Sequence, residues 1–213
     1  MENNEFWKEK LAGYDEHEWS KHPSIFAQDV ARLFPPRGSV LELAGGQGQD
    51  SRWFASQGFN VTYSDLVEDV VQKVRKQVAT DPNITCLAVD LSKELPFKAA
   101  SFDVVYSHMG LHYFDRMETR RIFANIHHTL KPDGIVALIL NTIDDPEIQT
   151  YGYRQIEPHF FEDPRSGLKK SYFSSGYVQE LTRDLFEQLL NDHNGKTYKD
   201  SVQTLVRFVG KKR

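Results

Sequence analysis

A glycine-rich turn and the acids around it are the first residues of this chain that could do chemistry. Residues 44–48, with the sequence AGGQG, follow a short apolar run directly and lead into a segment with helical spacing. Glycines at such a turn allow a sharp change of direction and let a ligand approach the backbone closely. Glu42 stands before the turn and Asp50 after it, and negative charges at a helix N-terminus would repel a pyrophosphate. The turn therefore predicts a site for a ligand that carries positive charge.

Two further acids stand at the ends of later apolar runs. Asp65 follows the run at 61–64, and Asp90 follows the run at 84–89. At the end of a parallel strand, the Asp65 carboxylate can accept two hydrogen bonds from vicinal ribose hydroxyls. The other interpretation of Asp65 is the N-cap of the next helix, since Asp is a favoured N-cap residue.

Histidines follow the fourth apolar run. His108 and His112 come directly after residues 102–107, at the sheet edge where open α/β proteins bind ligands. A histidine titrates near neutral pH and can act as a general base, so both are candidate catalytic residues. Each could instead have a structural role, as a helix cap or a partly buried side chain. The pair His127-His128 falls on a helix away from this edge and predicts a surface position, and no metal-ligand spacing is found.

The elements that must position these residues alternate along the chain. Apolar runs predict strands at 39–43, 60–64, 84–89, 102–107 and 135–140, and helical spacing predicts helices at 49–57, 67–79 and 116–130. A turn at 131–134 precedes the fifth strand. Beyond it we expect a helix at 178–190 and two strands at 196–198 and 203–209, the last pair antiparallel. This order predicts a Rossmann-like, doubly wound α/β fold: a mostly parallel seven-stranded sheet with helices on both faces and a lid insert.

The whole chain is expected to form one domain. Its expected parts are an N-terminal helical cap at 1–37, a ligand-binding core at 38–142, an insert at 143–175 and a C-terminal helix with strands at 176–213. The insert is long and aromatic, and a connection of that length is usually functional or mobile, which predicts a lid or specificity element. Aromatic residues of the cap and the insert could cover the site: Trp7, Tyr14, Trp19, Tyr151, Tyr153, Phe160 and Phe161.

Composition narrows the class of protein. The 213 residues carry a net charge of −4, which disfavours nucleic acid as a bulk partner. A single cysteine, Cys86, excludes an internal disulfide and is expected to be buried in a strand. No apolar run is long enough for a membrane span, and the acidic N-terminus is unlike a signal peptide. We therefore expect a cytoplasmic enzyme.

The motifs, in this order, resemble those of class I S-adenosylmethionine-dependent methyltransferases over about residues 38–142. Glu42, Gly46 and Gly48 match the family's first motif, an acid followed by alternating glycines, and Ala44 replaces the first glycine. The segments 95–97, 102–105 and 131–134 are similar to later motifs of small-molecule methyltransferases. The resemblance implies that S-adenosylmethionine is the cofactor, and its two positive groups agree with the acids near the turn. It implies that the cofactor-binding residues are Glu42, Ala44, Gly46, Gly48, Asp65, Leu66, Asp90, Leu91, Ser107 and His108.

Four functions remain open at this point. The expected one is in-line methyl transfer to a small-molecule acceptor. An RNA methyltransferase of the same fold would need a basic face, which the net charge does not favour. An NAD-dependent oxidoreductase is disfavoured by the acids near the turn and by the lack of a Ser/Tyr-x-x-x-Lys pair after the fourth strand. A binding protein without turnover would keep the same pocket.

Overall fold

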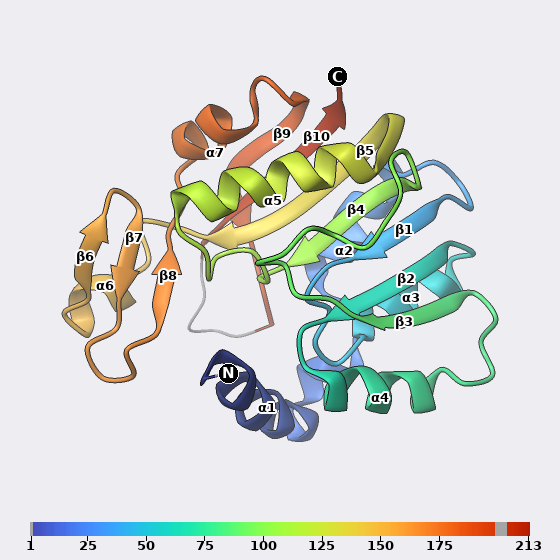
Figure 1. The fold of residues 1–213 in the computed structure, drawn as a ribbon, viewed down its shortest axis with the longest axis horizontal. Coiled ribbons are helices and arrows are strands. Elements are labelled where there is room, and N and C mark those ends of the chain that lie inside the picture. Colours follow the sequence, from blue (N-terminus) through green and yellow to red (C-terminus); the bar gives the residue numbers. More distant parts are fainter. Residues whose placement is uncertain (1, 199–203) are drawn as a thin grey trace.

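A seven-stranded sheet forms the centre of the computed structural model, which describes residues 2–198 and 204–213. The strand order is β3-β2-β1-β4-β5-β10-β9, and helices lie on both faces (Figure 1). The first five strands pair in parallel, while β10 runs antiparallel to both β5 and β9. This confirms the predicted mostly parallel sheet. The strands are β1 (Ser39–Glu42), β2 (Asn60–Asp65), β3 (Ile84–Ala88), β4 (Phe102–His108), β5 (Leu130–Asn141), β9 (Phe186–Gly195) and β10 (Leu205–Lys212).

Two layers of helices bury the sheet. On one face α5 and α7 pack on β4, β5 and β10, and on the other face α2 and α3 pack on β1, β4 and β5. A third group of helix residues, from α4, covers Tyr63 and Cys86 of β2 and β3. Strands buried on both faces read as unbroken apolar runs, which explains why residues 135–140 contain no polar side chain. The helices are α1 (Glu2–Ala12), α2 (Ile25–Val30), α3 (Gln49–Ser56), α4 (Glu68–Gln77), α5 (Arg116–Thr129), α6 (Glu147–Thr150) and α7 (Ser175–Thr182), with short 3-10 turns at Gly13–Glu16, Glu18–Lys21 and Ala31–Leu33.

Helix α5 shows how local sequence fixes an element. Asp115 accepts a hydrogen bond from the backbone of Glu118, whose side chain in turn accepts from the Asp115 N–H, which completes a capping box. Ile122, Phe123 and Ile126 then form an apolar stripe that is buried against the sheet. The capped start of α5 ends the loop that follows β4, so this cap also fixes one end of the loop that carries His112.

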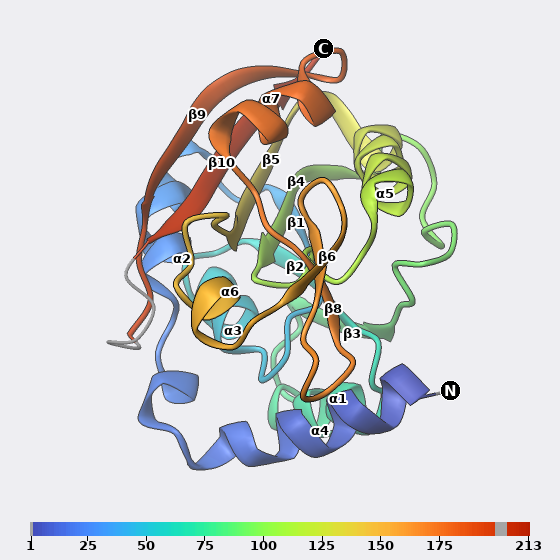
Figure 2. The ribbon, with the colours of Figure 1, turned by 90° about the vertical axis from the view of Figure 1, so that its left-hand side faces the viewer.

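The insert folds as a second, smaller sheet. Its strands are β6 (Arg154–Glu157), β7 (Phe160–Glu162) and β8 (Lys169–Ser171), and they pair antiparallel in that order. Figure 1 shows this small sheet beyond the carboxyl ends of β4 and β5, and Figure 2 shows it in front of the main sheet. The backbone N–H of Ser171 donates to the His112 carbonyl at 2.7 Å, and its hydroxyl donates to the Phe114 carbonyl at 2.6 Å. Through these two hydrogen bonds the insert stabilises the loop after β4.

Three local predictions are wrong. The expected helix at 178–190 ends at Thr182, and β9 begins at Phe186; the spacing of Phe186, Leu189 and Leu190 looks helical, but pairing with β10 decides the conformation. The expected strand at 196–198 is absent, because β9 ends at Gly195. The expected turn at 131–134 is an irregular start of β5 instead.

The remaining strand prediction is close. The strand expected at 203–209 is β10, which runs from Leu205 to Lys212, while Gln203 lies outside the described residues. Cys86 is buried in β3, as expected. In the described part of the chain no helix has the length and hydropathy that crossing a bilayer requires.

Candidate cofactor and acceptor site

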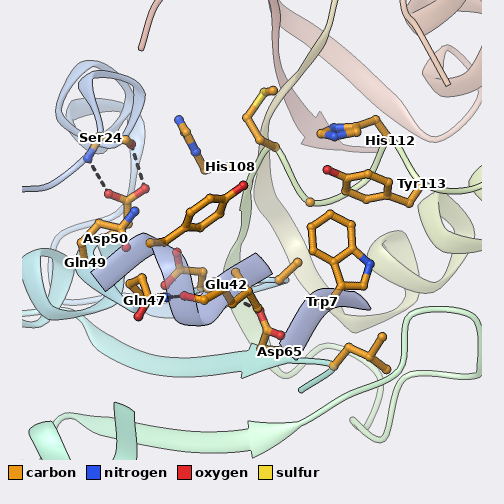
Figure 3. A pocket seen from close by; sticks show the side chains of 18 of the residues that line it. Trp7, Ser24, Glu42, Gln47, Gln49, Asp50, Asp65, His108, His112 and Tyr113 are labelled. Atoms are coloured by element: carbon orange, nitrogen blue, oxygen red, sulfur yellow. Dashed lines mark hydrogen bonds between the residues drawn. The ribbon is translucent and has the colours of Figure 1, made fainter. Parts of the chain in front are cut away.

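A cavity of about 300 Å³ opens at the carboxyl ends of the parallel strands (Figure 3). Its walls come from six separate parts of the chain: the N-terminal segment, the glycine-rich turn with its flanking residues, the end of β2, the residues after β3, the loop after β4 and the start of the segment after β9. A volume of this size suits a small-molecule or cofactor site. The cavity brings together most of the predicted site residues: Glu42, Ala44, Gly46, Asp65, Leu66, Asp90, Leu91, His108 and His112.

The glycine-rich turn adopts left-handed backbone conformations. Gly46 has a φ of 52° and Gly48 a φ of 69°, which glycine adopts without strain. Ala44, which replaces the family's first glycine, is held at a φ of 54°, at a cost of roughly 1–2 kcal/mol. Gly48 caps α3, and a Cβ there would meet Val74 at 2.8 Å, so this glycine lets α4 pack closely against the turn. Gly48 is not among the described residues that line the cavity.

Glu42 lies at the end of β1, and only 2% of its surface is exposed. Its carboxylate accepts a hydrogen bond from the Ser51 hydroxyl. Burial and the neighbouring Asp50 raise the pKa of Glu42 well above its ordinary value. A cationic ligand in the cavity would restore the charged form, because an opposite charge stabilises a carboxylate.

Asp65 ends β2 and connects the turn to the next helix. Its carboxylate accepts hydrogen bonds from the backbone N–H of Gly46 at 2.9 Å and of Val67 at 3.1 Å. These bonds leave lone pairs on both oxygens, since each carboxylate oxygen can accept two hydrogen bonds. The N-cap position of α4 belongs to Val67, so Asp65 is not the helix cap. Burial raises the pKa of Asp65.

Asp90 lines the cavity after β3, the strand that pairs with β2. It is half-buried and accepts hydrogen bonds from the backbone and the hydroxyl of Ser92. Burial opposes ionisation, but these hydrogen bonds and Lys93 outweigh it and lower the pKa of Asp90. Leu66 and Leu91 follow the two acids and add apolar surface to the same wall.

Asp50 anchors the N-terminal segment to the core. It accepts from the backbone N–H of Ser24 at 2.6 Å, from the Ser24 hydroxyl at 2.7 Å and from the Tyr106 hydroxyl at 2.6 Å. Ser24 is also the N-cap of α2. The serine before a helical stripe is a recognisable capping signal, but nothing in the sequence indicates that it pairs with Asp50.

The loop after β4 carries both candidate bases. His112 is 2% exposed, and its Nδ1 has no hydrogen-bond partner among the described residues. Burial, followed by the positive charges of Lys170 and Lys10, holds its pKa well below the ordinary histidine value. Figure 3 shows His112 beside Tyr113 on one side of the cavity and His108 on another. His112 is therefore neutral near pH 7.

Ser107 occupies a different place from its neighbours. Its hydroxyl donates to the Leu43 carbonyl at 2.9 Å, which joins β4 to the start of the turn. The side chain is buried and is not among the described residues that line the cavity. Only its backbone can therefore serve the cofactor role that the resemblance implies, and that role stays a prediction.

Of the aromatic residues expected to cover the site, those of the cap line the cavity and those of the insert are not among its described lining residues. Trp7, Tyr14 and Trp19 of the cap line the cavity, whereas Tyr151, Tyr153, Phe160 and Phe161 of the insert are not among the described lining residues. Phe161 packs instead on Tyr172 within the insert, with ring centroids 5.6 Å apart. The sequence reasoning did not place several residues that do line the cavity: Ser24, Ile25, Gln49, Thr197 and Tyr198.

The fold and the cavity define an α/β protein with a candidate ligand site at the carboxyl ends of its parallel strands. Residues 40–134 match the sequence profile of a family described as a methyltransferase domain. An uncharacterized methyltransferase from Synechocystis sp. is 31% identical over 104 residues, which make up 49% of this chain and 47% of that protein. The malonyl-[acyl-carrier protein] O-methyltransferase of Enterobacter lignolyticus is 28% identical over 139 residues, or 64% of this chain and 51% of that protein. The chain thus spans about half the length of these curated relatives.

A solved structure has the same fold over nearly the whole chain. It is the 1,6-didemethyltoxoflavin-N1-methyltransferase of Burkholderia thailandensis with bound 1,6-didemethyltoxoflavin and S-adenosylhomocysteine. The TM-score is 0.73 at 19% identity, over 97% of this chain and 83% of that one. Residues 40–134 are thus similar to methyltransferase domains, and the chain has the fold of a methyltransferase that was solved with bound S-adenosylhomocysteine.

Proposed function

We propose that this chain transfers the methyl group of S-adenosylmethionine to a small-molecule acceptor. The observation that carries the proposal is a cavity with four acids in its wall, Glu42, Asp50, Asp65 and Asp90. A ligand with a sulfonium, an ammonium and two ribose hydroxyls matches such a wall, because it offers cations and hydrogen-bond donors to carboxylates.

The residues present fit this cofactor at each of its parts. Glu42 and the backbone of the glycine-rich turn would hold the methionine portion, and Asp65 would accept from the ribose. Asp90, Leu66 and Leu91 would hold the adenine. The cofactor supplies an electrophilic methyl group, so the protein needs mainly to position an acceptor and exclude water. His108 and His112 are the side chains placed to take a proton from an acceptor.

The same acids weigh against the two enzyme alternatives. A pyrophosphate of NAD would meet Glu42 and Asp50 near the start of α3, where both side chains are buried. RNA would need cations near the mouth of the site, and no lysine or arginine is among the described residues that line the cavity. A pocket that binds the cofactor without turnover is separated from an enzyme by measuring S-adenosylhomocysteine production with candidate acceptors.

The first experiment is calorimetric titration of the purified protein with S-adenosylmethionine, S-adenosylhomocysteine and NAD. We expect the first two to bind and NAD not to bind. Binding of NAD alone would overturn the proposal.

Substitution of Asp65 tests the site itself. Asp65→Ala should weaken S-adenosylmethionine binding by about 1–3 kcal/mol, because hydrogen bonds to a charged group are lost. Asp65→Asn keeps the size of the side chain and separates loss of binding from disturbance of the turn. Asp184, whose side chain is 86% exposed, gives the matched control Asp184→Ala, which should leave the affinity unchanged. Wild-type affinity in both Asp65 variants would remove this residue from the site.

A further inference from the structure

The charges in the cavity wall restrict what the methyl acceptor can be. Four of the described lining residues carry a carboxyl group, Glu42, Asp50, Asp65 and Asp90, and none is a lysine or an arginine. A carboxylate, phosphate or other oxyanion placed beside them would lose its hydration without gaining a cationic partner, at a large cost in free energy. The described wall therefore offers an anionic acceptor no direct cationic partner, since Lys170 and Lys10, whose charges act on His112, are not among the described lining residues.

Aromatic rings from the N-terminal segment and from the loop after β4 form another part of the wall. Trp7 packs on Tyr113 with ring centroids 4.5 Å apart, and Trp19 packs on Tyr14 with centroids 5.2 Å apart. These four rings line the cavity together with Phe114. Rings held at fixed angles by their neighbours favour flat apolar ligands, because aromatic groups attract one another in stacked and edge-to-face arrangements.

One buried polar atom in this aromatic wall lacks a partner. The Nδ1 of His112 makes no hydrogen bond within the described chain, although the residue is 2% exposed, and Figure 3 shows its ring directed into the cavity beside Tyr113. An unsatisfied buried group costs about 1–3 kcal/mol, so such groups normally mark a ligand or an ordered water. Its position among aromatic rings indicates that the partner comes from the acceptor.

We infer that the acceptor is an uncharged, planar aromatic molecule whose hydroxyl or N–H group donates a hydrogen bond to His112 Nδ1. This inference rests on the proposed function. In the transfer step the bond from the sulfonium sulfur to the methyl carbon breaks, with its electron pair retained by sulfur. The new bond forms from the acceptor oxygen or nitrogen to that carbon. The proton of the acceptor passes to His112 Nδ1 and then to water, and S-adenosylhomocysteine is released.

Matched pairs of aromatic compounds test the inference. Naphthol and hydroxynaphthoate, catechol and protocatechuate, and indole and indole carboxylate each share a ring and differ by one negative charge. Binding of each compound to the protein saturated with S-adenosylhomocysteine is measured by calorimetry, and methyl transfer is followed as S-adenosylhomocysteine produced. We expect each neutral compound to bind at least about tenfold more tightly than its carboxylate partner, because like charges repel across a buried interface. Equal or tighter binding of the carboxylates would overturn the inference.

The His112→Phe variant tests the hydrogen bond separately. It keeps a flat ring but removes Nδ1, and we expect about tenfold weaker binding of the neutral compounds, the loss of one hydrogen bond to a buried partner. Affinity for S-adenosylhomocysteine should stay within about twofold, since that ligand belongs to the other side of the cavity. His128→Phe, at an exposed histidine of α5, is the control and should bind like the wild type.

The outcomes separate the two proposals. If S-adenosylhomocysteine binds but none of the neutral compounds does, or if His112→Phe binds them as the wild type does, the inference about the acceptor fails and the cofactor assignment stands. If S-adenosylhomocysteine itself does not bind to the wild type, the proposed function fails.

Discussion

The proposed cofactor side of the cavity comes mostly from one continuous segment, whereas the proposed acceptor side comes from segments far apart in the chain. Residues 42–66 contribute β1, the glycine-rich turn and the end of β2, and they supply three of the four acids in the wall. The acceptor side takes Trp7 and Trp19 from the cap, His112 and Tyr113 from the loop after β4, and Tyr198 from the segment after β9.

This difference in chain origin predicts how substitutions on each side of the cavity affect ligand binding. On the cofactor side, strands, turn and acids hold one another, as in the hydrogen bond from Gly46 to Asp65. On the acceptor side, the loop is held from outside the cavity by Ser171 of the insert. We therefore expect changes in the turn to abolish cofactor binding, and changes in the insert to alter acceptor use while cofactor binding persists.

The largest effect is expected from a methyl group added at Gly45. A Cβ there would lie 2.6 Å from the Tyr63 ring and 2.9 Å from the Glu42 side chain, so the turn must shift. Overpacking of this kind costs about 1–3 kcal/mol of stability, and a displacement of about 1 Å in a binding loop can reduce function about 100-fold. Gly45→Ala should therefore lose nearly all S-adenosylmethionine binding in calorimetry.

The control for this change is Gly13→Ala. A Cβ at Gly13 meets nothing within 4 Å, so thermal stability and affinity should both stay close to wild type. Wild-type affinity of Gly45→Ala for S-adenosylmethionine would show that the turn tolerates movement. It would contradict the expected difference between the two sides of the cavity.

A smaller effect is expected from substitution of Glu42, which should raise the stability of the protein and weaken cofactor binding. Because burial and Asp50 raise its pKa in the folded state, the native protein binds this proton more tightly than the unfolded chain does. Stability of the ligand-free protein should thus fall as the pH rises from the ordinary Glu pKa of 4.5 toward the raised value. Glu42→Gln removes this penalty and should raise the melting temperature at pH 7, while S-adenosylmethionine binds about tenfold more weakly for lack of the charge.

Two measurements check this prediction. Thermal unfolding across pH 4 to 8 should be flatter in Glu42→Gln than in the wild type. Calorimetry in two buffers of different ionisation enthalpy should detect proton release when the wild type binds S-adenosylmethionine, and less release in the variant. A variant that is less stable than the wild type at pH 7 would contradict the expected penalty.

The smallest effect is expected at Ser171. Ser171→Ala removes the hydrogen bond to the Phe114 carbonyl but keeps the backbone hydrogen bond to His112, at a cost of about 1 kcal/mol. Acceptor kcat/KM should fall about threefold to tenfold, while S-adenosylmethionine affinity stays unchanged. Ser166→Ala, at an exposed position of the same insert, is the control. A parallel loss of cofactor affinity would show that the two sides of the cavity are not independent.

The difference between a continuous segment and distant segments also explains which site residues could be predicted from the sequence. The first five strands and the positions of Glu42, Asp65 and Asp90 follow from local signals, because each acid directly follows an apolar run and the parallel strands bring those ends to one edge. Tyr198 and Ser24 gave no comparable signal. Tyr198 reaches the cavity through a hydrogen bond to the Pro23 carbonyl, and that contact joins positions 175 residues apart. Contacts between residues this far apart in the sequence form only when the chain folds, so local sequence signals do not predict them.

Two of the three tryptophans of this chain lie in the cavity wall, and this gives the protein an optical reporter of its own. Trp7 and Trp19 line the cavity, whereas Trp53 packs against Phe54 on α3, with ring centroids 5.3 Å apart, and is not among the described lining residues. Indole emission depends on the polarity and quenchers around the ring. Filling of the cavity should therefore change the fluorescence of Trp7 and Trp19 over a steady background from Trp53, so cofactor and acceptor binding can be followed without any label.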